Sequence, residues 1–196
     1  MKKLHRHDMW CWSQFDKKRN IDFHSYLWVR TEGNVVFDPL PLTEHDQNHL
    51  DSLGGVRYVL LTNSDHIRGT QNLVLENQAS VAGPEGERDT FPIDCDRWLS
   101  GDDIPLPGLQ CIEMEGSKTA GELAFLVEET TLITGDLIRS ERAGRLDMLP
   151  TDMLVDPEKA RDSIKNLLEF SRIDSVLVGD GWPVFNDGLK QIRNLI

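Results

Sequence analysis

Three apolar runs of the chain each lead into an aspartate, and this recurring pattern constrains the fold more than any other feature. The run around Leu60 leads to Asp65 and His66, and the runs "TTLITGD" and "DSVLVGDG" lead to Asp136 and Asp180. Short apolar runs bounded by turn residues predict buried strands. A carboxylate at a strand end is held rigidly and can face a cleft, as a metal ion or a reacting water requires. Each aspartate alone also fits a cap on the next turn, but their order along the chain favours a shared site.

Strand-like and helix-like segments alternate along the whole chain without internal repeats. The region from 84 to 108 is the most irregular, and we expect a lid or an edge excursion there. Strand-rich halves, each followed by helices, predict an α+β fold in which two stacked sheets are covered on both outer faces. Strands are expected at about 24–38 (a hairpin), 57–61, 79–83, 109–115, 122–127, 130–136 and 174–181, and helices at about 43–52, 67–77, 157–170 and from 186.

Composition narrows the class of protein further. A length of 196 residues predicts one domain, 1–196, and 28% charged with 39% hydrophobic residues is ordinary globular usage. The net charge of -12 argues against nucleic acid or an anionic membrane surface as the main partner. The sequence has neither an apolar run long enough for a membrane span nor the apolar core of a signal peptide, so we expect a cytoplasmic protein. Three separated cysteines, without a CxxC pair, predict neither disulfides nor a thiolate zinc site.

Four stretches, in order, resemble the metallo-β-lactamase superfamily. "HSYLWVRTEGNVVFDPLPL" resembles the opening hairpin of that family, which ends in Asp-Pro-Gly, and "YVLLTNSDHIRG" stands where the family has Thr-His-x-His-x-Asp-His-x-Gly-Gly. "GSKTAGELAFLVEETTLITGDLI" is similar to its Gly-His-Thr-Pro-Gly-Ser turn and the following Gly-Asp strand end. "VLVGDGWPVFNDG" is similar to its last site strand. The resemblance covers about 22–190 and implies a four-layer αββα sandwich.

The resemblance also implies which residues hold metal. In the family, one ion is bound by three histidines, and a second by the Asp-His pair of the motif with a late histidine, while the Gly-Asp carboxylate bridges both. By position, Asp65 and His66 match the Asp-His pair, Asp136 matches the bridge, and Asp180 replaces the late histidine. The three histidines of the first ion are missing. Their places include Asn63 and, at the turn, Lys118.

Charge bookkeeping gives Lys118 two alternative roles. The three carboxylates of Asp65, Asp136 and Asp180 would be neutralised by one divalent ion together with the ammonium of Lys118. In this hypothesis Lys118 replaces the first ion, and Asp65, His66, Asp136 and Asp180 hold one ion of zinc, manganese or ferrous iron. In the alternative, Lys118 pairs with Asp136 and no ion is bound.

Two functions follow from these alternatives. The first is a metal-dependent hydrolase of a small ester, thioester or related substrate, in which Asp65 is both a ligand and the group that orients the water. The second is a non-catalytic binding or regulatory protein whose cleft, rimmed by Lys118, Arg68 and Arg139, takes an anionic small molecule. Asn63 and His24 are further candidate contacts, although a packed histidine is the more ordinary outcome for His24. The sequence carries no signal for the oligomeric state.

Overall fold

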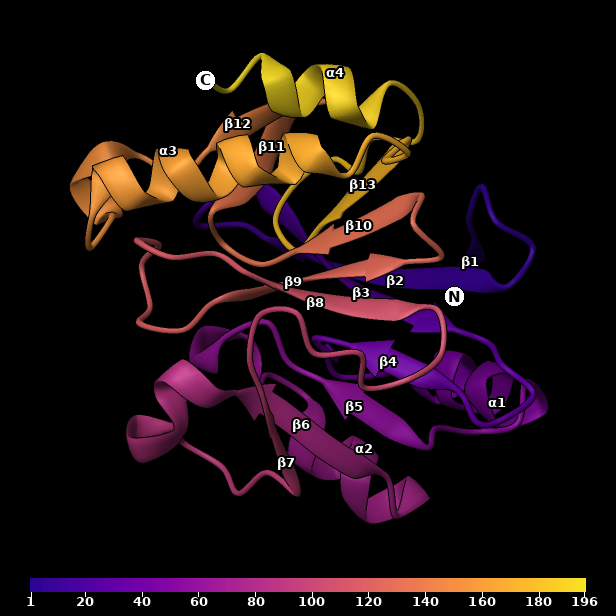
Figure 1. Ribbon diagram of the computed structural model, residues 1–196. Coiled ribbons are helices and arrows are strands. Elements are labelled where there is room, and N and C mark those ends of the chain that lie inside the picture. Colours follow the sequence, from indigo (N-terminus) through magenta and orange to yellow (C-terminus); the bar gives the residue numbers. More distant parts are fainter.

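The computed structural model describes all 196 residues and has the four-layer arrangement expected from the sequence. Figure 1 shows two sheets in the middle of the molecule, with α3 (Pro157–Asn166) and α4 (Gly188–Arg193) on one outer side. On the other side lie α1 (Glu44–Ser52) and α2 (Thr70–Asn77). The predicted αββα fold class is therefore confirmed.

The first sheet contains seven strands that follow one another in chain order. The neighbours from β1 to β4 pair antiparallel, and those from β4 to β7 pair parallel. The strands are β1 Lys2–Lys3, β2 Met9–Asp16, β3 Ile21–Trp28, β4 Val35–Phe37, β5 Tyr58–Leu60, β6 Ser80–Pro84 and β7 Arg97–Leu99.

The second sheet has four strands in the order β13-β10-β9-β8, and a two-stranded ribbon, β11 with β12, lies beside it. Strands β10 and β13 run parallel, so their carboxyl ends reach the same edge of the sheet. The strands are β8 Leu109–Glu113, β9 Leu123–Val127, β10 Thr131–Thr134, β11 Ile138–Arg142, β12 Arg145–Met148 and β13 Ser175–Val178.

Three apolar clusters fill the spaces between the four layers. The first joins the two sheets, where Phe37 of β4 packs near Phe125 of β9 with ring centroids 5.4 Å apart. The second lies between the second sheet and its helices and includes Ile164 and Ile192. The third lies between the first sheet and its helices and includes Leu50 and Leu73. Each sheet is therefore buried on both faces, which explains the nearly continuous apolar runs of strands such as β9.

Local capping signals account for where two of the helices begin. The Thr43 hydroxyl accepts a hydrogen bond from the backbone N–H of Asp46 at the start of α1. Asp156 caps α3 through its carboxylate, and Pro157 occupies the first helical position. No helix of the molecule is both long and apolar enough to cross a membrane.

The irregular region 84–108 contains a 3₁₀ segment, Glu85–Thr90, and the short edge strand β7. It therefore extends the edge of the first sheet. The main difference from the sequence-based elements lies at the N-terminus, where β2 forms an eight-residue antiparallel hairpin with β3, from Met9 opposite Trp28 to Asp16 opposite Ile21. The alternating aromatic pattern of β2 is the signal that indicates this strand.

Candidate functional site

Four strand ends meet at one edge of the molecule and carry the candidate site. Asp38 follows β4, His66 lies in the 3₁₀ turn Ser64–His66 after β5, Asp136 follows β10, and Asp180 follows β13. Backbone hydrogen bonds join the two sheets here: Leu123 N–H donates to Thr62 O, and His24 N–H donates to Gly179 O, each at 2.8 Å. The parallel pairing of β4 with β5 and of β10 with β13 aligns these ends.

A glycine before Asp180 makes close packing at this edge possible. A Cβ atom on Gly179 would lie 2.8 Å from Cε1 of His66, closer than real Cβ contacts. The Gly-Asp pairing of the sequence therefore has a steric reason: the glycine gives the imidazole room next to the strand that carries the aspartate.

His66 is held from behind by a carboxylate that sequence reasoning did not place in the site. Its Nδ1 lies 2.8 Å from Oδ2 of Asp38, and both side chains are buried. Asp38 also accepts hydrogen bonds from the backbone N–H of Thr62 at 2.8 Å and from its hydroxyl at 2.7 Å. Because Nδ1 faces Asp38, Nε2 of His66 is directed toward Asp136, whose Oδ1 lies 3.7 Å away.

Charge around His66 favours its protonated form. Burial by itself lowers the pKa of His66, but the negative charge of Asp38 and the hydrogen bonds to Asp136 and Asp38 outweigh burial and raise the pKa to about 10. For the acid Asp136 burial acts in the opposite direction and raises the pKa. The hydrogen bond and charge of His66, followed by the charge of Lys118, outweigh burial and bring the pKa of Asp136 well below its ordinary value. The two groups form an ion pair in the metal-free protein.

His66, Asp136 and Asp180 form the one group of ligand side chains that converges closely enough for a metal ion. One potential ligand atom from each lies within 4.8 Å of the others, and all three residues are buried. A nitrogen and two carboxylate oxygens form a donor set that zinc, manganese and ferrous iron accept.

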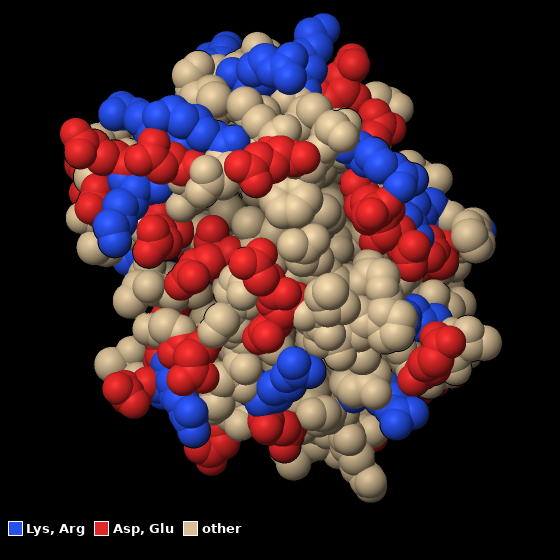
Figure 2. Space-filling view, in the orientation of Figure 1, with Lys and Arg blue, Asp and Glu red and all other residues tan.

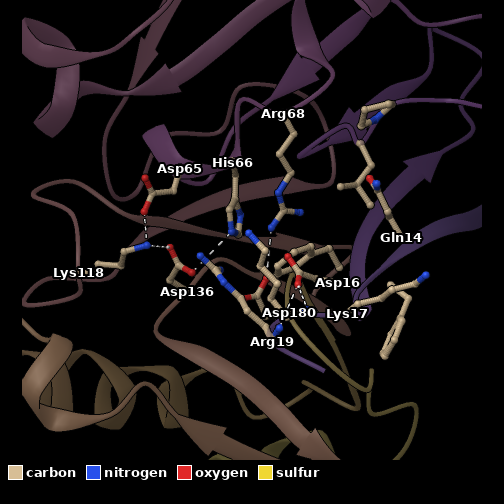
Figure 3. A pocket seen from close by; sticks show the side chains of 15 residues that line it. Gln14, Asp16, Lys17, Arg19, Asp65, His66, Arg68, Lys118, Asp136 and Asp180 are labelled. Atoms are coloured by element: carbon tan, nitrogen blue, oxygen red, sulfur yellow. Dashed lines mark hydrogen bonds and ion pairs between the residues drawn. The ribbon is translucent and has the colours of Figure 1, made fainter. Parts of the chain in front are cut away.

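Asp65 lies outside this group of three. It is exposed, and its carboxylate forms an ion pair with the ammonium of Lys118. Oδ2 of Asp136 lies 3.8 Å from the same ammonium, so Lys118 bridges the two carboxylates, as Figure 3 shows. Burial lowers the pKa of Lys118, but Asp65 and Asp136 outweigh it and raise the pKa above its ordinary value. The role of Asp65 as a metal ligand stays a prediction.

Two arginines form ion pairs with Asp180, Arg68 from the segment before α2 and Arg139 from β11. An Nη atom of Arg68 lies 3.2 Å from Oδ1, and an Nη atom of Arg139 on β11 lies 3.7 Å from Oδ2. Arg68 has a φ of 31°, in the region that favours glycine, which is the residue the resemblance places there. Its guanidinium also donates to the backbone oxygen of His24 at 3.3 Å, and these contacts hold the uncommon backbone conformation in place.

The remaining two candidates support the site from its sides. Asn63 is buried, donates to Oδ2 of Asp136 at 3.3 Å, and accepts from the backbone N–H of Asp65 at 3.0 Å. It therefore ties the 3₁₀ turn to the second sheet. The ring of His24 stacks on Tyr26 with centroids 6.1 Å apart and does not line the pocket described below, so His24 reaches the site only through its backbone.

A buried acid, Glu122, lies behind Asp136, and the sequence does not predict it as part of the site. Its carboxyl contacts the Ser117 hydroxyl at 2.5 Å and accepts from the backbone N–H of Leu137 at 2.9 Å. Burial, together with the nearby charge of Asp136, raises its pKa to about 8. The signal for Glu122 was weak, because a glutamate within "GSKTAGEL" also fits an exposed turn.

The charges of the site balance without an added ion. Every strand-end carboxylate has a cationic neighbour, and Glu122 is neutral at pH 7 because its pKa is about 8. The network contains four carboxylates, Asp38, Asp65, Asp136 and Asp180, and four cationic groups, His66, Lys118, Arg68 and Arg139. The charge sum from the sequence used three carboxylates, Lys118 and one divalent ion. The structure adds the acid Asp38 and the cations His66, Arg68 and Arg139 to that sum.

A pocket of about 740 Å³ opens above these residues. Its lining combines the site, including Asp65, His66 and Asp136, with the turn between β2 and β3 (Figure 3). A concave surface of this size, with buried ionisable groups at its floor, is the usual form of a small-molecule site.

The fold and the pocket define an αββα protein with a strand-end ligand site between its two sheets. A family model described as the metallo-beta-lactamase superfamily matches residues 1–196, so the chain belongs to that superfamily. The resemblance noted in the sequence is thereby confirmed. Membership supports a metal-dependent hydrolase as the general class of function. No curated protein matches the chain.

Solved structures of the same fold are similar over nearly the whole chain. A metallo-beta-lactamase from Pontibacter korlensis has a TM-score of 0.77 at 16% identity, covering 98% of this chain and 96% of that one. A metallo-beta-lactamase from Erythrobacter litoralis, with beta mercaptoethanol in the active site, has a TM-score of 0.78 at 12% identity, with coverages of 98% and 94%. TTHA1623 in a di-iron-bound form has a TM-score of 0.67 at 22% identity, with coverages of 91% and 96%. At these identities the likeness shows the fold.

Proposed function

We propose that the protein is a metal-dependent hydrolase of a small ester, thioester or related substrate, with a single-ion site. The observation that carries this proposal is the convergence of His66, Asp136 and Asp180 within 4.8 Å at the floor of the pocket. The donor set fits a divalent ion that displaces the Nε2 proton of His66, because Asp38 holds Nδ1 and leaves Nε2 directed toward Asp136. Zinc, manganese and ferrous iron are all compatible with one imidazole and two carboxylates.

The side chains around this group have separate roles in the proposed reaction. A divalent ion bound there would lower the pKa of a water molecule and polarise a carbonyl oxygen. Lys118 supplies positive charge between Asp65 and Asp136, where the resemblance places part of the first ion's site. Asp65 is exposed to the pocket and would accept a hydrogen bond from the attacking water. Asn63 holds the backbone of Asp65 in position.

A second candidate function is a metal-free protein that binds an anionic small molecule. The specific observation in its favour is that Asp180 is already held by Arg68 and Arg139, so that an ion would have to share this carboxylate with two guanidinium groups. The neutral network of four carboxylates and four cations supports the same alternative, since it leaves no charge deficit for an ion to fill.

Hydrolysis of 4-nitrophenyl acetate and of a simple thioester by protein loaded with zinc, manganese or iron(II) tests the first function. We expect turnover that a chelator abolishes, that metal restores, and that Asp136→Asn removes. Asp152→Asn is the matched control, because Asp152 is exposed and forms no ion pair. Turnover that survives the chelator or Asp136→Asn would rule out this site as its source.

A further inference from the structure

The turn between β2 and β3 presents three consecutive cationic side chains, Lys17, Lys18 and Arg19. The carboxylate of Asp16 fixes the turn, accepting from the backbone N–H of Lys18 at 2.7 Å and from that of Arg19 at 3.0 Å. The Asp16 carboxylate therefore fixes the turn through its backbone N–H groups, and the three basic side chains are not needed to shape it.

All three turn cations line the pocket, and none of them forms an ion pair. The guanidinium carbon of Arg19 lies 5.6 Å from the centre of the Phe23 ring, a cation–π contact that orients it. In Figure 3 the side chain of Arg19 extends across the pocket toward Asp136, and that of Lys17 points away from the floor.

The carboxylates at the floor do not account for these cations. Asp65 and Asp136 are paired with Lys118, and Asp180 is paired with Arg68 and Arg139. Neutralising the floor therefore requires no charge from the turn. The turn adds positive charge above a site that is already balanced.

The pocket is consequently positive in a strongly acidic protein. Its lining includes five Lys and Arg side chains, the protonated His66 and four Asp side chains, which sum to two positive charges, whereas the whole chain carries -12 with its histidines counted as neutral. Figure 2 shows how widely acidic side chains are spread over one face of the molecule. A positive concavity in such a protein attracts anions and concentrates them.

We propose that the pocket takes an organic anion, a carboxylate or a phosphate ester, and that Lys17, Lys18 and Arg19 hold its anionic group. The rest of the ligand then contacts Phe15, an exposed side chain of the same pocket, and reaches the strand-end carboxylates. This inference rests on the proposed function only in taking this pocket as the substrate site. The turn cations would serve a metal-loaded hydrolase and a metal-free binding protein equally.

Calorimetric titration of chelator-treated protein with phenyl phosphate, benzoate and neutral benzamide tests the proposal. We expect both anions to bind more tightly than benzamide, with the tighter anion identifying the preferred headgroup. The variant K17Q/K18Q/R19Q should lose about tenfold or more in anion affinity, since charge-assisted hydrogen bonds are the strong ones. The control K190Q/R193Q/R161Q makes the same change in net charge away from the pocket, and should bind as the unmodified protein does. Circular dichroism checks that both variants are folded.

Equal anion affinity in the turn variant and the unmodified protein would overturn the proposal, as would an equal loss in the control variant or no preference over benzamide. Hydrolysis distinguishes this failure from failure of the proposed function. If metal-loaded protein cleaves 4-nitrophenyl acetate but the turn variant leaves KM for an anionic 4-nitrophenyl ester unchanged, the inference alone fails. If no ester is cleaved but anion affinity depends on the turn, the inference holds and the hydrolase proposal fails.

Discussion

His66 and Asp38 form a buried ion pair, with Nδ1 of the histidine 2.8 Å from Oδ2 of the aspartate. This contact joins the ends of β4 and β5 and sets which ring nitrogen of His66 faces the pocket. Asp38→Asn removes the closer of the two carboxylates that pair with the imidazolium and leaves only Asp136, 3.7 Å away, and breaking a buried pair costs about 3 kcal/mol or more. We expect a loss of this size in the free energy of unfolding, measured with urea, and a fall in the pKa of His66 from about 10, measured by NMR. A stability change as small as that of the exposed control Asp152→Asn would contradict this role.

Arg68→Gly should strengthen metal binding. The substitution removes a guanidinium 3.2 Å from Asp180 and places glycine at a φ of 31°. Removing one competing charge should tighten zinc affinity by about tenfold or more, equivalent to about 1.4 kcal/mol. Arg68→Lys is the matched control because it keeps the charge, and its affinity should stay close to that of the unmodified protein. If Arg68→Gly binds zinc no more tightly than Arg68→Lys does, Arg68 does not compete for the site.

Lys118→Gln should reduce turnover with little effect on stability. Lys118 is partly exposed and touches two carboxylates, and an exposed ion pair stabilises a protein by about 1 kcal/mol or less. Loss of a positive charge that stabilises the transition state costs about a hundredfold in kcat. Lys118→Arg should retain most of the activity. Equal kcat in Lys118→Gln and the unmodified protein would show that Lys118 only fills space in the site.

The buried acid Glu122 predicts a pH dependence of stability. Its pKa in the folded protein is about 8, against 4.5 ordinarily, so the folded state holds a proton that the unfolded state has released between these values. Its contribution to stability is complete below about pH 4.5 and is lost as pH rises through 8, with a slope of at most about 1.4 kcal/mol per pH unit. Glu122→Gln, which stays neutral, should be the more stable protein at pH 8 relative to pH 5. Urea unfolding across this range, with chelator present, measures the difference, and parallel curves for the two proteins would contradict it.

Much of the fold could be predicted from the sequence because its signals are local. The strand ends at Asp136 and Asp180 follow apolar runs that are buried on both faces, and α3 begins where Asp156 and Pro157 indicate. Strand β2 was missed because its alternating pattern stands before the segment that resembles the family. The charged turn after it therefore received no role.

The candidate site was only partly predictable, because its electrostatics depend on contacts between distant segments. Lys118 lies between Asp65 and Asp136 as its position in the resemblance implies. Asp38 is 28 residues away from His66, and nothing in the sequence shows that its carboxylate faces the imidazole. The neutrality of Glu122 arises from burial behind Asp136, which depends on tertiary packing.

Metal stoichiometry is the most direct test of the central claim that His66, Asp136 and Asp180 hold one divalent ion. Protein is incubated with zinc, manganese or iron(II), dialysed, and measured by elemental analysis and thermal unfolding. The account predicts one equivalent of bound metal, a rise in Tm, and loss of both in Asp180→Asn and Asp136→Asn but not in Asp152→Asn. No retained metal and an unchanged Tm with all three ions would contradict the single-ion site and leave the metal-free anion-binding function.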